Sequence, residues 1–210
     1  MTPTRRAARG QAPRAAGSAA RTSGAKRTAG SSAARARSFP PLIAPAARVL
    51  ILGSMPGAAS LAAGQYYAHP YNQFWRILGA LCGARADLAY PLRLQRLRAH
   101  GIALWDVLES CVRPGSLDSA IEHASALAND IPGLLRAAPR IRRICCNGAS
   151  AYESVRRYHG DELDALGITV LRLPSTSPAN AAWSFARKLA AWRAALEDGG
   201  RNADADGSGR

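Results

Sequence analysis

The stretch ILGSMPGAASLAAGQYYAHPYNQFW, residues 51–75, concentrates residue types that can bind and polarise a small ligand. An apolar run ends at Gly53, and the turn GSMPG follows it directly. Glycines permit a tight turn whose backbone N–H groups point at a ligand, and such a nest of donors suits a carbonyl oxygen or an anionic leaving group. We therefore predict that this turn lines a binding site, although the glycines could instead simply end a strand. The residues of the turn are Gly53, Ser54, Met55, Pro56 and Gly57.

Asn72 is the polar side chain that we expect to take part in a reaction. An amide is not a strong base, but it can hold a water molecule against a reacting carbon atom. Asn is also favoured just before a helix, and the sequence predicts a helix from Gln73 onward, so Asn72 could cap that helix as well. His69 could contact a ligand or a phosphate, and we favour the simpler role of bracing the loop.

Three aromatic residues of the same stretch could stack on a flat ligand: Tyr66, Tyr67 and Phe74. The two tyrosines lie in a loop, where an aromatic ring is harder to explain by packing alone. The spacing does not decide between them. Trp75 stands at the expected helix start and is predicted to belong to the core.

The rest of the chain predicts a scaffold of alternating strands and helices. The run RVLIL at 48–52 is nearly all apolar, which is typical of a central parallel strand. Further strands are predicted at 102–106, 141–146 and 168–173, and helices at 73–81, 88–100, 116–123, 131–138, 149–158 and 180–196. We predict that Gly101 ends the second helix and that Ser116 or Asp118 caps the third. The fold class is therefore α/β, three layers with a central, mostly parallel sheet of about four strands.

A second unusual loop, LPSTSPAN at 173–180, follows the last predicted strand. Ligands of open α/β sheets bind beyond the carboxyl ends of the strands, so the two loops should meet at one site. The hydroxyl and backbone N–H groups of this loop suit phosphate contacts. The two prolines of the loop would stiffen it, and its asparagine could cap the last helix. The residues concerned are Pro174, Ser175, Thr176, Ser177, Pro178 and Asn180.

Together these motifs resemble those of the uracil-DNA glycosylase superfamily over residues 40–195. GSMPG resembles its Gly-x-x-Pro-Gly turn, and HPYNQFW resembles the His-Pro-x-Asn-x-Phe-Trp run of the mismatch-specific and hypoxanthine-DNA glycosylase branches. LPSTSPAN resembles the strand-ending Pro-Ser loop that enters the duplex. The details SLAAGQYYAHPYNQFW and LPSTSPAN are most similar to the hypoxanthine-DNA (deoxyinosine) glycosylase branch.

The resemblance implies a uracil-DNA-glycosylase-like fold and a monofunctional DNA repair enzyme. Such an enzyme hydrolyses the N-glycosidic bond of a deaminated base after the base has flipped out of double-stranded DNA, and the base expected here is hypoxanthine. It uses no metal and no cofactor. The resemblance assigns Asn72 to the attacking water, and base stacking on an aromatic ring contributes roughly 1–3 kcal/mol. The lysines are Lys26 and Lys188, neither close in sequence to the motifs, so we expect no lyase activity.

Two departures leave the substrate open. Uracil-specific members have an acid or Asn at the position of Met55, and some members have His or Asn at that of Leu173. Both departures weaken a uracil assignment and fit a purine, which leaves more easily when its ring nitrogens are protonated. The alternatives are a uracil or mismatch G:T/U glycosylase and an inactive nucleic-acid-binding module.

The net charge of +14 is concentrated at the N-terminus, because residues 1–38 hold eight Arg, one Lys and no acid. We predict a disordered basic tail over 1–38, a folded domain over 39–196 and a second disordered tail over 197–210. The first tail could bind DNA phosphates, target an organelle or be neutral filler. We expect a monomer located in the cytoplasm with the bacterial nucleoid, with organellar targeting left open. The sequence contains no run of eighteen apolar residues, so we expect no transmembrane helix.

The remaining candidates are four cysteines, two acids and one arginine. Cys82, Cys111, Cys145 and Cys146 match no metal-binding spacing and are expected to be buried thiols, with Cys145 and Cys146 on opposite faces of a strand. Asp106 ends a predicted strand and could face the site or cap a turn. The sequence likewise leaves the role of Asp118 undecided, and Arg113 could hold a phosphate.

Overall fold

A computed structural model describes residues 35–201, and a parallel sheet of four strands forms its centre. The strands are β2 (Val49–Gly53), β3 (Ile102–Asp106), β6 (Arg143–Asn147) and β7 (Thr169–Leu173), in the order β3-β2-β6-β7. Every pairing in this sheet is parallel, so all four carboxyl ends lie along one edge. The predicted fold class is confirmed, with the first predicted strand at its centre.

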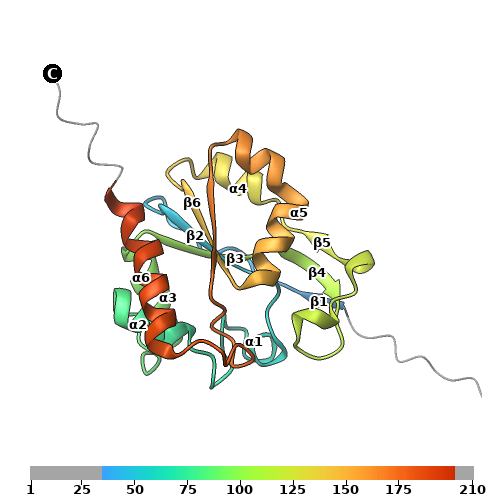
Figure 1. The fold of residues 1–210 in the computed structure, drawn as a ribbon, viewed down its shortest axis with the longest axis horizontal. Helices are drawn as coiled ribbons and strands as arrows, with labels where there is room; N and C mark the ends of the chain where they lie inside the picture. The colour runs from blue at the N-terminus through green and yellow to red at the C-terminus, as the bar shows by residue number, and fades with distance from the viewer. Residues whose placement is uncertain (1–34, 202–210) are drawn as a thin grey trace, which may run out of the picture. The chain divides into compact units, whose positions relative to one another are not determined.

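Helices cover both faces of the sheet (Figure 1). One face carries α2 (Phe74–Cys82), α3 (Tyr90–Ala99) and α6 (Phe185–Arg201), and the other carries α4 (Ile131–Ala137) and α5 (Ala149–Ala165). Successive strand residues point to opposite faces, so each strand serves both layers of the core. The two resulting clusters of buried residues hold the helices against the sheet.

Strand β2 shows why the sequence folds this way. All five of its residues are buried, because both of its faces are covered and both of its edges are paired. Val49 and Ile51 pack under α2, α3 and α6, whereas Leu50 and Leu52 pack under α4 and α5. A near-continuous apolar run is what such a doubly covered strand requires.

The four cysteines are buried, free thiols, as expected. The neighbours Cys145 and Cys146 belong to the two different core clusters, which confirms that they point to opposite faces of β6.

A small antiparallel sheet lies beside the main one and was not predicted. It consists of β1 (Arg35–Arg37), β4 (Leu108–Val112) and β5 (Leu127–Ala128), in the order β1-β4-β5. The prediction that the N-terminal tail runs to residue 38 is therefore wrong at its end, because residues 35–37 pair with β4. Residues 1–34 and 202–210 lie outside the described residues, and with them most of both predicted tails.

Several predicted boundaries need correction. The helix expected at 116–123 is two short 3₁₀ turns, Asp118–Ala120 and His123–Ser125, neither capped by a side chain. The last helix begins at Phe185 instead of residue 180 and continues to Arg201, into the predicted second tail. The short helix α1 (Ala58–Ala63) inside the first loop was missed.

Other boundaries hold. The strand at 102–106 was predicted correctly, and Gly101 has the left-handed conformation (φ 68°) expected of a residue that ends a helix. Among residues 35–201, no helix combines the length and apolar character that crossing a membrane requires.

Candidate active site

The two unusual loops meet at the carboxyl edge of the sheet. Gly53 at the end of β2 lies opposite Asp106 at the end of β3, and Asn147 at the end of β6 lies opposite Leu173 at the end of β7. The Gln73 backbone N–H donates a 2.9 Å hydrogen bond to the Thr176 carbonyl oxygen, which joins the first loop directly to the second. The expectation that the two loops meet at this edge is confirmed.

The turn GSMPG is held from behind by a buried arginine. Arg113 donates to the carbonyl oxygens of Met55 and Pro56, and its guanidinium lies 3.5 Å from the Asp118 carboxylate. Asp118 in turn accepts a 2.6 Å hydrogen bond from the Ser54 hydroxyl. Only 1% of the Arg113 side chain is exposed, so the expected phosphate contact at this residue is wrong.

This bracing fixes the direction of the peptide groups in the turn. The Ser54 carbonyl accepts a hydrogen bond from the Leu108 N–H, and the Pro56 carbonyl faces Arg113. In a trans peptide the N–H points opposite to the C=O. The N–H groups of Met55 and Gly57 therefore point away from Leu108 and Arg113, and so away from the groups that hold the turn. These are the donors that the nest prediction requires.

The structure separates the two adjacent tyrosines. Tyr66 is 5% exposed, and its ring packs edge-on against Phe39. The Tyr90 hydroxyl accepts a hydrogen bond from the Tyr66 backbone N–H, and the Tyr66 carbonyl accepts one from the Trp75 ring N–H. Tyr66 is therefore a core residue that anchors the loop, which removes it from the stacking candidates.

Tyr67 lies over the end of β2 instead. Its backbone is left-handed (φ 54°), and Tyr67 is the only non-glycine residue within 35–201 that has a positive φ. Its ring stacks on Phe74 with centroids 3.8 Å apart and planes inclined by 18°. Phe74 is fully buried, so it supports the Tyr67 ring from below and has no face left for a ligand. The strained backbone places a partly exposed ring and its hydroxyl at the site.

Gly53 and Asp106 form the floor of the site. A Cβ atom at Gly53 would lie 2.5 Å from Asp106 Oδ1 and 3.2 Å from the Tyr67 hydroxyl, so the two polar groups converge where the glycine has no side chain. Asp106 is 3% exposed. Neither its Oδ2 nor the Tyr67 hydroxyl has a hydrogen-bond partner, although both are buried. Buried polar atoms are nearly always paired, so two unpaired atoms at one point mark a place for a ligand or a water.

Burial determines the protonation of this floor. Loss of solvation and, to a smaller extent, the negative charge of Asp118 raise the pKa of Asp106 to about 8, although the positive charge of Arg113 opposes both. Burial and the charge of Asp106 also raise the pKa of Tyr67 well above its ordinary value, against a smaller lowering by the Asn147 amide. Asp106 is therefore largely a neutral carboxylic acid at pH 7, and Tyr67 is a neutral phenol.

Asn147 ends β6 and was not among the site residues predicted from the sequence. Its amide makes two hydrogen bonds to Thr176, donating to Oγ1 and accepting from the backbone N–H, each 2.9 Å long. Thr176 is fully buried, so this pairing clamps the second loop onto the end of β6, and the phosphate contact predicted for Thr176 is wrong. The signal was present in the sequence, because a polar amide directly after a buried strand stands at the edge where ligands bind.

Asn72 is partly exposed, in the same loop as the exposed His69 and Tyr71. The Asn72 Oδ1 accepts a 3.0 Å hydrogen bond from the Phe74 N–H at the start of α2, although the N-cap residue of this helix is Gln73 and not Asn72 as predicted. A second lone pair on that oxygen and the NH₂ group remain for a water molecule. His69 is exposed, and its ring nitrogen accepts a hydrogen bond from the Tyr71 N–H within the loop, in agreement with bracing. Tyr71, which we had not considered, is 77% exposed.

The second loop is stiffened by its own hydrogen bonds. The Ser175 and Ser177 hydroxyls accept from the N–H groups two residues on, and the Asn180 side chain donates to the Ser175 carbonyl. The prediction that Asn180 caps the last helix is wrong, since that helix begins at Phe185. Pro174 and Pro178 bound the loop, and the Pro174 carbonyl accepts a hydrogen bond from Trp192.

Lys188 lies closer to this loop than the sequence suggested. Its buried amino group donates a 2.8 Å hydrogen bond to the Asn180 carbonyl, and burial lowers its pKa. The expectation that both lysines lie far from the motifs is therefore wrong for Lys188 in the folded structure. This hydrogen bond supports the backbone at the end of the loop.

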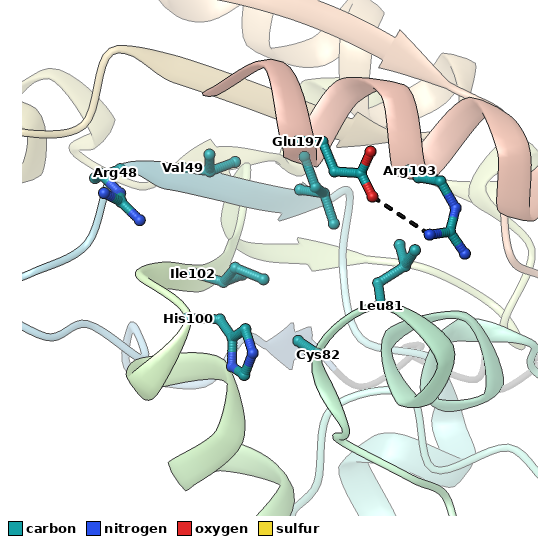
Figure 2. A pocket seen from close by; sticks show the side chains of 9 residues that line it. Arg48, Val49, Leu81, Cys82, His100, Ile102, Arg193 and Glu197 are labelled. Carbon is teal, nitrogen blue, oxygen red and sulfur yellow. Dashed lines mark hydrogen bonds and ion pairs between the residues drawn. The ribbon is translucent and has the colours of Figure 1, made fainter. Parts of the chain in front are cut away.

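The opposite edge of the sheet carries a pocket of about 150 Å³. Its walls come from the starts of β2 and β3 and the ends of α2, α3 and α6 (Figure 2). Arg193 and Glu197 from α6 form an ion pair on one side, and Arg48 and His100 lie on the other. These charged side chains are exposed, so this pocket has none of the buried, unpaired polar groups of the carboxyl edge.

The geometry of the carboxyl edge suits a flat polar base turned into the site. It offers a stacked tyrosine ring, a neutral acid, an amide and the N–H groups of a tight turn. Among residues 35–197, no three histidine, cysteine or acidic side chains are grouped to hold a metal ion.

Comparison with known proteins gives consistent matches. The family model "Uracil DNA glycosylase superfamily" matches residues 40–198. A protein from Methanosarcina acetivorans named hypoxanthine DNA glycosylase is 38% identical over 155 residues, which are 72% of this chain and 92% of that protein. A Methanosarcina barkeri protein of the same name is 37% identical over 131 residues, 61% of this chain and 82% of that protein.

A solved structure agrees with these matches. The solution NMR structure of a candidate uracil DNA glycosylase from Methanosarcina acetivorans superimposes with a TM-score of 0.66 at 36% identity. The superposition covers 79% of this chain and 99% of that protein.

Proposed function

The chain belongs to the uracil DNA glycosylase superfamily, and we propose that it releases hypoxanthine from deoxyinosine in double-stranded DNA. It is a DNA glycosylase, a hydrolase that cleaves the N-glycosidic bond between base and sugar. The deaminated base has to leave the base stack before it can reach the carboxyl edge of the sheet.

The observation that carries the proposal is the direct junction of the two loops. The Gln73 N–H to Thr176 carbonyl hydrogen bond joins HPYNQFW to LPSTSPAN at the edge where Gly53, Asp106 and Asn147 end their strands. One loop carries residues suited to the reaction, and the other carries hydroxyl and N–H groups suited to the phosphate backbone. The union of both in one site is what base release from a duplex requires.

In the proposed reaction the base stacks on the exposed side of Tyr67, because Phe74 covers the other side. Asn72 holds the attacking water, using the hydrogen-bonding capacity that its bond to Phe74 leaves over. The transition state develops positive charge on the sugar, as in other glycoside cleavage, while electrons move to the base. The N–H groups of Met55 and Gly57 are the candidates to stabilise that base.

The two departures from the superfamily motifs are consistent with this assignment. Met55 is 5% exposed and Leu173 is 7% exposed, and both pack in the core clusters. Neither brings an acid, an amide or an imidazole to the site. The chemistry therefore falls to Asn72 and to the polar groups around Gly53.

The decisive test is single-turnover base release from matched duplexes that carry one deoxyinosine, one deoxyuridine, one G:T mismatch or one deoxyxanthosine. Alkali cleaves the resulting abasic sites, which makes release visible. We expect deoxyinosine to react fastest, and Asn72→Ala to lower its rate at least tenfold with DNA binding nearly intact. An equal rate in the Asn72→Ala protein would remove this residue from the mechanism.

A second function is favoured by the solved structure of a candidate uracil DNA glycosylase. Release of uracil ahead of hypoxanthine in the same experiment would identify a uracil or mismatch glycosylase that works without the usual acid. Binding of all four duplexes without release from any of them would indicate a nucleic-acid-binding module instead.

The basic N-terminus is proposed to add affinity for DNA of any sequence. Nine positive charges and no acid lie in residues 1–38. Each phosphate contact releases counterions, so its loss reduces the salt dependence of binding. Removal of residues 1–34, which hold seven of these charges, should therefore flatten the slope of log affinity against log salt, and an unchanged slope would contradict this role.

A further inference from the structure

Asp106 is a buried acid that the proposed mechanism does not yet use. Its carboxyl group lies at the end of β3, against the bare Cα of Gly53 and beside the Tyr67 hydroxyl. The backbone carbonyl of Asp106 is satisfied by Asn129, whereas Oδ2 has no partner. A side chain with a purely structural role would be expected to pair with one of the donors around it.

The surroundings of Asp106 are arranged so that no cation neutralises it. Arg113 is the positive group that lowers the pKa of Asp106, but its two terminal nitrogens contact the Met55 and Pro56 carbonyls and Asp118, and its buried Nε has no partner. Asp118 contributes a second negative charge, and Tyr66 and Tyr67 contribute neutral phenols. A buried acid without a paired cation keeps its proton more readily than one in water.

We propose that Asp106 contacts the flipped purine and acts as a general acid, delivering its proton to a ring nitrogen of the leaving base. This inference rests on the proposed function, because it names a residue for the same reaction. It assigns the unpaired carboxyl oxygen a partner, and it places the Tyr67 hydroxyl beside the same edge of the base. Protonation is what makes a purine a good leaving group.

The step balances in atoms and electrons. The bond between the sugar C1′ and the base nitrogen breaks, and its electron pair goes to the base, which takes the proton of Asp106 and leaves as neutral hypoxanthine. Water forms the new bond to C1′ and loses a proton to solvent. Asp106 regains a proton from solvent when the product leaves, so no oxidant, reductant or further reactant is needed.

The experiment measures the single-turnover rate on deoxyinosine duplex across pH 5 to 10 for the wild type and for Asp106→Asn. Asn has the shape of the neutral acid but cannot deliver a proton. The acid form prevails below the pKa of about 8, so the wild-type rate should be level there and fall tenfold per pH unit above it. General acids contribute roughly 10²–10⁴-fold, so Asp106→Asn should be at least about a hundredfold slower and should lack the alkaline decline.

Two controls separate this role from a structural one. Asp118→Asn removes a charge that raises the pKa of Asp106, so the alkaline decline should move to lower pH. Asp106→Asn should bind deoxyinosine duplex as the wild type does and should be at least as stable at alkaline pH, since it never carries the buried charge.

The outcomes are distinct. Asp106→Asn that reacts at the wild-type rate, or that keeps the alkaline decline, would overturn the acid role and leave the proposed function standing. A wild-type protein silent on deoxyinosine at every pH would overturn both.

Discussion

The two edges of the central sheet differ in kind. The amino edge has a pocket, whereas the carboxyl edge has the features expected of a functional site. The amino edge has a pocket of about 150 Å³ whose charged residues, such as Arg193 and Glu197, pair with each other or lie in water. The carboxyl edge instead holds Asp106 and the Tyr67 hydroxyl, both buried and both without a full set of partners. Unpaired buried groups cost stability, whereas an exposed ion pair costs almost nothing.

The difference between the edges indicates that unpaired buried polar groups mark a functional site, whereas the presence of a pocket does not. The carboxyl edge also carries a left-handed Tyr67 and a turn held by a buried arginine, which are further strained or costly features. Such features persist only where surrounding structure maintains them. The following variants test whether the edges differ in function as they differ in structure.

The largest effect is expected from Gly53→Ala. The added Cβ would lie 2.5 Å from Asp106 Oδ1, so the carboxyl group or the strand end must move. Overpacking costs about 1–3 kcal/mol of stability, and displacement of a reacting group by about 1 Å can lower a rate about a hundredfold. Single-turnover release of hypoxanthine and thermal unfolding measure both effects.

Gly57→Ala is the matched control for that variant. Its Cβ would meet only the Ser116 side chain, at an ordinary distance of 3.8 Å, so its melting temperature should match the wild type. If Gly53→Ala were as active and as stable as Gly57→Ala, the close approach of Asp106 to the end of β2 would be wrong.

The next effect is expected from Asn147→Ala, which opens the clamp on the second loop. It removes two hydrogen bonds and leaves the buried Thr176 N–H unpaired, at a cost of roughly 1–3 kcal/mol. Base release should fall at least about tenfold because the loop that carries the DNA contacts shifts. Thr176→Val keeps the backbone hydrogen bond to Asn147, so it should lose less stability and less base release than Asn147→Ala does. An equal loss in the two variants would mean that the Thr176 hydroxyl alone holds the loop.

A smaller effect is expected from Tyr67→Phe. The ring and its stacking on Phe74 remain, while a buried hydroxyl without a partner disappears. The melting temperature should stay level or rise, and base release should fall several-fold, about the worth of one hydrogen bond. A lower melting temperature with unchanged release would show that the hydroxyl serves the fold and not the base.

The comparison also explains what the sequence could predict. The strand at 102–106 and the buried core of β2 follow from apolar runs, and the meeting of the two loops follows from parallel strands whose ends share one edge. The roles of Tyr66 and Tyr67 could not be separated, because adjacent residues in a loop have no periodicity and only tertiary contacts with Phe39 and Phe74 decide which ring is buried.

Asp106, Arg113 and Asn147 show the other limit. Each ends a strand or stands in a loop, and its role depends on distant partners, such as Thr176 for Asn147, 29 residues away, and Met55 for Arg113, 58 residues away. Hydrogen bonds over such separations leave no local pattern. The β4 and β1 strands were missed for a related reason, since a short polar strand such as Arg35–Arg37 is stabilised by its neighbour and not by its own composition.

The smallest effect is expected at the amino edge, and it decides whether the comparison holds. Arg193→Ala removes an exposed ion pair with Glu197 and opens the wall of the pocket, at a cost of about 0–1 kcal/mol. Hypoxanthine release should stay within twofold of the wild type, because this pocket lies at the start of β2 and Gly53 lies at its other end. A tenfold loss at unchanged stability would mean that the amino edge takes part in the reaction or in DNA binding. The cost of buried polar groups would then no longer distinguish the functional edge from the other.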